Sequence, residues 1–216
     1  MTAPATATRP APRLHVVGDS ISMQYGPDLE RMLAPAVAYS RKTGTSGNLD
    51  RPEGANGGDS GMVLAYLREL AADAREPVAL LLVNCGLHDI KIFAGKTGRQ
   101  IEPEAYAANL RDIAILAPRI TRRVAWIRTT HVVDAVHARH STAFARSAAD
   151  VDAYNAIADG VMRAAGARII DLHGFTRTLG GDDLFCDHVH FTEPVRAQQA
   201  AFIAGCVTTL LETPAP

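Results

Sequence analysis

The sequence predicts an α/β fold, a three-layer α/β/α sandwich around a five-stranded, mostly parallel sheet. Short apolar runs alternate five times with segments of helical periodicity. The segments between successive runs are long enough for the right-handed crossovers that parallel strands require. The run Val78–Val83 is apolar at every position, as expected for a strand buried on both faces of a parallel sheet.

The expected strands cover residues 13–17, 36–41, 78–83, 124–127 and 168–172. The expected helices open at 26–27, after 59–60 and at 103, and then cover 150–165 and 194–211. Pro27 suits a first helical position, Asp59 and Ser60 suit an N-cap, and Gly166 suits a C-cap. Residues 42–57, 91–102 and 131–146 are expected to form loops, and a loop as long as 42–57 is more often functional than idle.

Composition limits the classes of protein that the chain can belong to. Its 216 residues suffice for one domain with a sizeable core, and 47% hydrophobic and 21% charged residues are ordinary for a soluble protein. The net charge of -1, without any block of like charge, gives no electrostatic argument for a nucleic-acid partner. No apolar run approaches the roughly 18 residues of a membrane span, so we expect none.

The ends and the cysteines suggest how the chain is organised. Residues 1–12 are rich in Ala, Thr and Pro and lack the pattern of a secretory signal, so we expect a flexible leader before a single domain over 13–212. Three cysteines, Cys85, Cys186 and Cys206, are too few for a disulfide framework and suit a reducing compartment. We therefore expect a cytoplasmic protein.

Four polar stretches follow strand ends and are expected on one rim of the sheet. They are Gly18–Ser20, the glycine-rich loop that ends near Gly58, Gly86–Asp89 and Asp187–His190. Because ligands of open α/β sheets bind outside the carboxyl ends of the strands, this rim is the candidate functional site.

The residue types at this rim suit nucleophilic catalysis by a serine. Serine needs a base within hydrogen-bond reach and a third group that orients the base. On a tight turn, the carboxylate of Asp187 can accept from one ring nitrogen of His190, which leaves the other nitrogen to take the proton of Ser20. Backbone N–H groups at Ser20 and in the glycine loop suit the oxyanion of a tetrahedral intermediate.

With these motifs in this order, nearly the whole chain resembles the SGNH, or GDSL-type, serine hydrolase superfamily of esterases and lipases. The resemblance rests on Gly-Asp-Ser after the first strand, Gly-x-x-Asp after the third and Asp-x-x-His before the last helix. It implies a flavodoxin-like fold, Ser20 as nucleophile, His190 as general base and Asp187 as the group that orients His190. It also implies that backbone N–H groups of Ser20 and of a glycine form part of the oxyanion hole, and it implies no metal or organic cofactor.

The chain departs from the family pattern at the oxyanion glycine. Two stretches are candidates, Thr45–Gly47 and Gly57–Ser60. We prefer Gly58 over Gly47, because Gly58 lies just before the expected helix and at a family-like distance from the third strand.

A sharper departure concerns His88, which stands where the family has the asparagine of Gly-x-Asn-Asp. Histidine can also donate a hydrogen bond to an oxyanion, so we include His88 in the oxyanion hole. Three alternatives remain: Asn56 or Asn84 supplies the amide, the hole has lost a donor, or His88 is a structural residue held by Asp89. We assign Asp19, Asn56 and Asp89 to the substrate-binding residues.

A second chemistry is suggested by His188 and His190, whose spacing, with Asp182 and Asp183 nearby, is compatible with a metal site. The sequence offers no third histidine or cysteine at a supporting spacing, so we favour the serine hydrolase and expect no metal.

The function that follows is cleavage of a carboxylic ester through an acyl-enzyme, with a small O-acyl ester such as an acetylated carbohydrate as the expected substrate. A thioesterase, lysophospholipase or acyltransferase on the same fold remains open. So does a catalytically weak domain that binds an acylated glycan or a protein partner. The sequence indicates neither the acyl group, nor the alcohol, nor the oligomeric state.

Overall fold

The computed structural model describes residues 10–44, 49, 51–52, 54–73, 77–141 and 143–213. Residues 1–9 of the expected leader and the candidate Gly47 lie outside the described residues. The flexible leader and the single domain over 13–212 therefore stay predictions.

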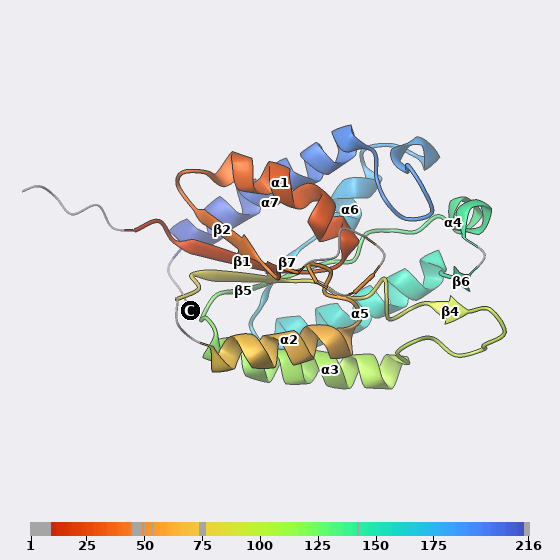
Figure 1. Cartoon of the computed structure of the whole chain (residues 1–216), viewed down its shortest axis with the longest axis horizontal. Helices are drawn as coiled ribbons and strands as arrows, with labels where there is room; N and C mark the ends of the chain where they lie inside the picture. Colours follow the sequence, from red (N-terminus) through yellow and green to blue (C-terminus); the bar gives the residue numbers. More distant parts are fainter. Residues whose placement is uncertain are drawn as a thin grey trace, which may run out of the picture.

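The central sheet has five strands in the order β2-β1-β3-β5-β7, and every pairing within it is parallel (Figure 1). The strands are β1 (Arg13–Val17), β2 (Ala38–Arg41), β3 (Leu80–Val83), β5 (Val124–Ile127) and β7 (Arg168–Ile170). This topology confirms the predicted α/β class and the five-stranded parallel sheet.

Helices cover both faces of the sheet (Figure 1). One layer holds α1 (Ser20–Leu33), α6 (Leu172–Arg177) and α7 (Glu193–Glu212), and the other holds α2 (Ser60–Ala72), α3 (Pro103–Leu116) and α5 (Ala148–Ala164). Short 3-10 turns cover Ala117–Arg119 and Asp182–Leu184. Among the described residues, no helix is long and apolar enough to cross a membrane.

The core is centred on β3, whose four residues are all buried. Leu81 and Leu82 are wholly shielded from solvent, as is Trp126 of the neighbouring strand. Burial of a leucine side chain stabilises a fold by about 1.5–3 kcal/mol. The unbroken apolar run Val78–Val83 therefore contains the central strand of the sheet, β3.

The first helix begins earlier than the sequence suggested. We expected it to open at Gly26–Pro27, but it begins at Ser20, because the Oδ1 atom of Asp19 accepts from the N–H of Ile21 at 3.0 Å and caps it. Pro27 therefore lies inside the helix, and Ser20 occupies its first position.

The expected loops 91–102 and 131–146 contain regular structure that the sequence did not reveal. Strands β4 (Ile92–Phe93) and β6 (Phe144–Ala145) pair in an antiparallel two-stranded sheet, and α4 (Asp134–His140) precedes β6. Elements of two residues are too short to show a period in the sequence. The last strand also ends at Ile170, because Asp171 caps α6 by accepting from the N–H of Gly174 at 2.9 Å.

Candidate active site

Ser20, His190 and Asp187 form one chain of hydrogen bonds beyond the end of β1. The Nε2 atom of His190 lies 2.7 Å from Oγ of Ser20, and its Nδ1 atom lies 2.7 Å from Oδ2 of Asp187. Ser20 and His190 are only 4% and 2% exposed. The structure thus brings together the three residues that the sequence proposed as nucleophile, base and orienting carboxylate.

The position of Ser20 follows from the sharp transition between β1 and α1. A Cβ atom added to Gly18 would lie 3.0 Å from both Cβ and Oγ of Ser22, so the turn leaves little room for a side chain. Ser20 is the first residue of the helix, where the backbone N–H has no acceptor within the helix. The N–H of Ser20 therefore suits an anionic oxygen, and the positive end of the helix dipole favours the same charge.

The orientation of His190 follows from the turn that starts at Asp187. Oδ1 of Asp187 accepts from the backbone N–H groups of Val189 and His190 at 2.9 and 2.8 Å. Burial alone would raise the pKa of Asp187, but the hydrogen bonds from the His190 ring and these N–H groups outweigh it and hold the pKa well below its usual range. Asp187 is therefore a carboxylate that keeps a proton on Nδ1 of His190 and leaves Nε2 as the acceptor.

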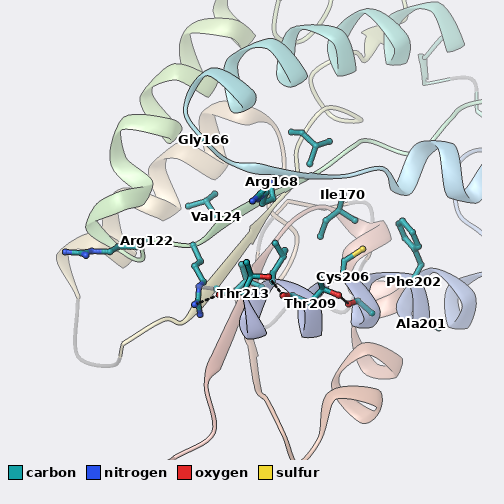
Figure 2. Close-up of a pocket in the computed structure, with 15 residues that line it drawn as sticks. Arg122, Val124, Gly166, Arg168, Ile170, Ala201, Phe202, Cys206, Thr209 and Thr213 are labelled. Atoms are coloured by element: carbon teal, nitrogen blue, oxygen red, sulfur yellow. Dashed lines mark hydrogen bonds between the residues drawn. The ribbon is translucent and has the colours of Figure 1, made fainter. Parts of the chain in front are cut away.

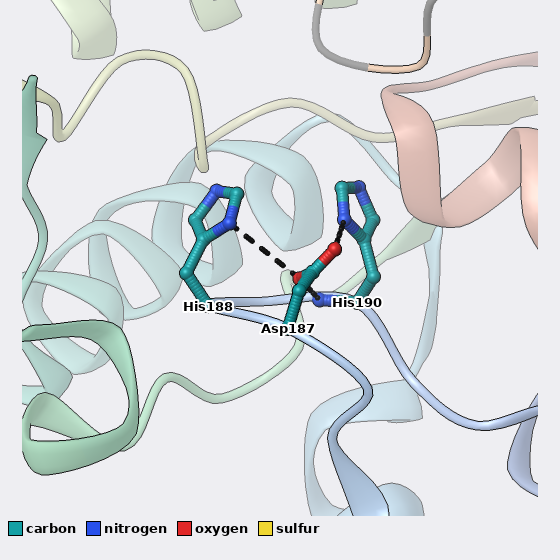
Figure 3. Close-up of side chains that lie close together, drawn as sticks. All are labelled: Asp187, His188 and His190. Atoms are coloured by element: carbon teal, nitrogen blue, oxygen red, sulfur yellow. Dashed lines mark hydrogen bonds and ion pairs between the residues drawn. The ribbon is translucent and has the colours of Figure 1, made fainter. Parts of the chain in front are cut away.

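The side chains of Asp187, His188 and His190 also lie close enough together to suggest a metal site (Figure 3). One ligand atom from each lies within 4.8 Å of the others, and Nδ1 of His188 is 3.5 Å from Oδ1 of Asp187. However, Nδ1 of His190 carries the proton that it donates to Asp187, and a protonated ring nitrogen is not a metal ligand. Asp182 instead forms an ion pair with Arg139 at 3.6 Å. The hydrogen bond between Asp187 and His190 instead continues from the His190 ring to Oγ of Ser20.

The glycine loop lies against the turn that carries Ser20. The N–H of Gly57 donates to the carbonyl of Gly18 at 2.9 Å. Gly58 has a φ of 72°, and a Cβ atom there would lie 2.6 Å from Sδ of Met62 and 2.9 Å from Cβ of Pro52. Only glycine fits this position without strain. The N–H of Gly58, which the sequence proposed as an oxyanion donor, donates to Oδ1 of Asn56 at 2.8 Å.

His88 is buried beside this loop. Its Nδ1 atom lies 3.2 Å from Nζ of Lys91, and its Nε2 atom lies 3.5 Å from Nδ2 of Asn56. Burial, followed by the nearby charges of Lys91 and Arg146, lowers the pKa of His88 to about 2. The His88 ring is therefore neutral at ordinary pH.

The alternative in which Asp89 holds His88 is wrong, because Asp89 has other partners. Its Oδ1 atom accepts from the backbone N–H of Ser60 at 2.9 Å, and burial raises its pKa to about 7. The alternative with Asn84 as oxyanion donor is also wrong. The Nδ2 atom of Asn84 donates to the carbonyl of Ile127 at 2.9 Å and to Oγ1 of Thr129 at 3.3 Å, so its amide is used inside the protein.

The three residues assigned to substrate binding have different surroundings. Asp19 caps α1, and burial raises the pKa of its carboxyl. Asp89 accepts from the backbone N–H of Ser60, the first residue of α2, whose N-cap is Asp59. Both carboxylates therefore contact the protein itself, whereas Asn56 alone of the three faces His88.

The sequence did not single out the cationic side chains next to His88. Nζ of Lys91 lies 4.7 Å from the ring centre of Phe144, and the guanidinium of Arg146 lies 4.8 Å from it. Nε of Arg146 also donates to the carbonyl of Leu87 at 2.6 Å. The spacing of Lys91, three residues after His88, was a signal, but Phe144 and Arg146 lay in a segment expected to be a loop.

A large cavity lies elsewhere, at the opposite end of the sheet (Figure 2). Its volume is about 730 Å³, and its walls come from the first residues of β3 and β5, from the whole of β7 and from α7. Arg123, which lines it, donates to the carbonyl of Thr213 at 2.7 Å. None of the residues that line it belongs to the Ser20 site, so this cavity is separate from the candidate active site.

Comparison with known proteins supports the fold but not a close relationship. No family model matches the chain, and no curated protein sequence matches it. A lipase/acylhydrolase from Enterococcus faecalis superposes with a TM-score of 0.67 at 18% identity, over 92% of this chain and 96% of that one.

Two esterases superpose over similar lengths. A carbohydrate acetylesterase from Sinorhizobium meliloti has a TM-score of 0.63 at 13% identity, over 93% of this chain and 100% of that one. An aryl esterase from M. smegmatis has a TM-score of 0.62 at 12% identity, with the same coverage of 93% and 100%. Two further structures, described as a member of the lipolytic protein G-D-S-L family and as a putative SGNH hydrolase, superpose with TM-scores of 0.60 and 0.61, so the chain has the SGNH, or GDSL-type, hydrolase fold.

Proposed function

We propose that this protein hydrolyses carboxylic esters with Ser20 as nucleophile, His190 as general base and Asp187 as the group that orients His190. The observation that supports this most directly is the chain of two 2.7 Å hydrogen bonds that joins the three side chains. The ionised state of Asp187 and the resulting acceptor at Nε2 of His190 give each residue the protonation that its role requires.

The reaction proceeds in two halves. Oγ of Ser20 attacks the ester carbonyl carbon while its proton moves to Nε2 of His190, and a tetrahedral oxyanion forms. The oxyanion collapses, the alcohol leaves with the proton from His190, and the acyl group stays on Ser20. Water then attacks the acyl carbonyl and gives a proton to His190, and collapse of the second intermediate releases the carboxylic acid and returns the proton to Ser20.

The oxyanion requires donors in both halves of the reaction. The N–H of Ser20 at the start of α1 is one, and the Nε2 side of His88 next to the glycine loop supplies another. The N–H of Gly58 donates to Oδ1 of Asn56, so we propose that Gly58 shapes the loop and orients Asn56 rather than donating to the oxyanion itself.

The expected substrate is a small O-acyl ester, such as an acetylated carbohydrate. The structural similarity to a protein described as a carbohydrate acetylesterase agrees with this choice. Thioester cleavage and acyl transfer would use the same acyl-enzyme, and they differ only in the leaving group and in the acceptor.

Hydrolysis of p-nitrophenyl acetate by purified protein tests the proposal. Ser20→Ala is expected to lower kcat by at least about 1000-fold, because the nucleophile is lost. Ser22→Ala is the matched control, since the Ser22 hydroxyl has other partners: it donates to the carbonyl of Asp19 at 2.6 Å and accepts from Nη2 of Arg41 at 3.1 Å. Absence of hydrolysis by the folded wild type, or equal activity in Ser20→Ala, would contradict the proposal.

A further inference from the structure

The two buried histidines of the site, His190 and His88, have partners of opposite charge at Nδ1. Nδ1 of His190 faces the carboxylate of Asp187 at 2.7 Å, whereas Nδ1 of His88 faces the ammonium of Lys91 at 3.2 Å. A carboxylate only accepts, so it keeps a proton on Nδ1 of His190. An ammonium only donates, so it occupies the lone pair of Nδ1 of His88.

This contact determines which nitrogen of His88 carries the proton. The ring is neutral, because burial and nearby positive charges disfavour a second proton. A neutral imidazole has a single N–H group, and Lys91 places it at Nε2. His88 is thus a fixed donor at Nε2, while His190 is a fixed acceptor at Nε2.

The Nε2–H group of His88 faces a second donor. Oδ1 of Asn56 accepts from the N–H of Gly58 at 2.8 Å, and Nδ2 donates to the carbonyl of Leu49 at 2.6 Å, so the orientation of the amide is determined. Nδ2 of Asn56 and Nε2 of His88 are 3.5 Å apart, and two donors do not bond to each other. Both instead suit one shared acceptor beside the glycine loop.

We propose that Lys91 is a positioning residue, which holds His88 in the Nε2–H tautomer so that His88, with Asn56, donates to the oxyanion formed at Ser20. This inference deepens the proposed ester hydrolysis and rests on it. The ammonium also withdraws electron density from the ring, which makes Nε2–H a stronger donor than that of an isolated neutral histidine. Asp187 has the opposite effect on His190.

The need for Lys91 follows from the replacement of an amide by an imidazole. The NH₂ group of an asparagine always donates, whereas a neutral histidine donates from either nitrogen and must be held in one tautomer. Lys91 is itself held in place, because it is 8% exposed and its Nζ lies 4.7 Å from the ring centre of Phe144. The pairing of β4 with β6 brings Phe144 to this position.

Nuclear magnetic resonance of ¹⁵N-histidine-labelled protein tests the tautomer without reference to activity. Long-range ¹H–¹⁵N spectra should show His88 as the Nε2–H tautomer in the wild type and a shift toward Nδ1–H in Lys91→Met. Lys91→Arg should keep the wild-type pattern, because a guanidinium also only donates. Lys96→Met is the matched control, since Lys96 is exposed in the same segment.

Kinetics test the consequence for catalysis. Lys91→Met should lower kcat for p-nitrophenyl acetate by about 10- to 100-fold with little change in KM, because a donor to the oxyanion is lost. Lys91→Arg should restore most of this kcat. In a His88→Asn background, Lys91→Met should change kcat by less than about threefold, because an amide has no tautomer to fix.

The outcomes separate the two proposals. An Nδ1–H tautomer of His88 in the wild type would overturn the role of Lys91, and so would wild-type kcat in Lys91→Met. A wild type with the expected tautomer but without ester hydrolysis would contradict the proposed function instead. Thermal unfolding of each variant distinguishes these results from a failure to fold.

Discussion

Oγ of Ser20 and Nε2 of His190 lie 2.7 Å apart, although 170 positions separate the two residues in the chain. Ser20 begins α1 and His190 lies just before α7, and these two helices pack against each other on one face of the sheet. The packing of α1 on α7 therefore fixes the distance on which the proposed chemistry depends.

Replacing Asp187 by asparagine tests how the orientation of His190 is set. The amide keeps the size of the side chain, but it removes the acceptor that holds the proton on Nδ1. We expect kcat for p-nitrophenyl acetate to fall by about 10,000-fold while the protein stays folded. A loss of less than tenfold would show that Asp187 does not orient the base.

The neutral state of His88 predicts how stability depends on pH. The folded pKa of about 2 lies below the value of about 6.5 in an unfolded chain, so below pH 6.5 the unfolded state binds a proton that the folded state does not. This group therefore lowers the free energy of unfolding as pH falls from about 6.5, by about 1.4 kcal/mol per pH unit.

Chemical denaturation at pH 7 and pH 5 measures this effect. His88→Asn lacks the titrating group, so it should lose about 2 kcal/mol less than the wild type between these two values. Equal losses in both proteins would indicate that His88 is protonated in the folded state.

Gly58→Ala tests whether the glycine loop needs its backbone conformation. The added methyl group meets Sδ of Met62 and Cβ of Pro52 at a φ of 72°, so we expect a loss of about 1–3 kcal/mol in stability together with reduced kcat. Gly160→Ala is the control, because a Cβ atom at this helical position meets nothing within 4 Å. That variant should be stabilised by roughly 0.5–1 kcal/mol. Unchanged stability and kcat in Gly58→Ala would contradict this description of the loop.

Two asparagines near the rim should respond differently to truncation. Asn84→Ala removes two buried hydrogen bonds that link β3 to the end of β5, so it should lower stability by about 1–3 kcal/mol with a small effect on kcat. Asn56→Ala removes a donor next to His88 and should lower kcat by about 10- to 100-fold. Measurement of kcat and of urea unfolding in both variants checks these two expectations. A large loss of kcat in Asn84→Ala, or a large loss of stability with unchanged kcat in Asn56→Ala, would refute them.

The sequence predicts the sheet well because its signals are local. The apolar run Val78–Val83 predicts a buried strand, and β3 lies within it. Asp59 caps α2 as expected, accepting from the N–H of Met62 at 3.0 Å. The start of α1 was missed because Pro27 resembles a first helical residue, while the capping contact of Asp19 decides the boundary.

The surroundings of His88 were predictable only in part. Its position beside the glycine loop follows from the rule that ligands bind at the carboxyl ends of parallel strands. Lys91 is three residues away, but Phe144, which lies against Lys91, comes from the pairing of two short strands more than 50 residues apart. Pairing at this separation leaves no period in the sequence.

Labelling with a fluorophosphonate probe, followed by peptide mass spectrometry, tests the central claim most directly. We expect one adduct, on Ser20, in the wild type, and much slower labelling in Asp187→Asn, because the base that activates Ser20 loses its orientation. No adduct under conditions that label a control esterase, or an adduct on another residue, would contradict Ser20 as the nucleophile.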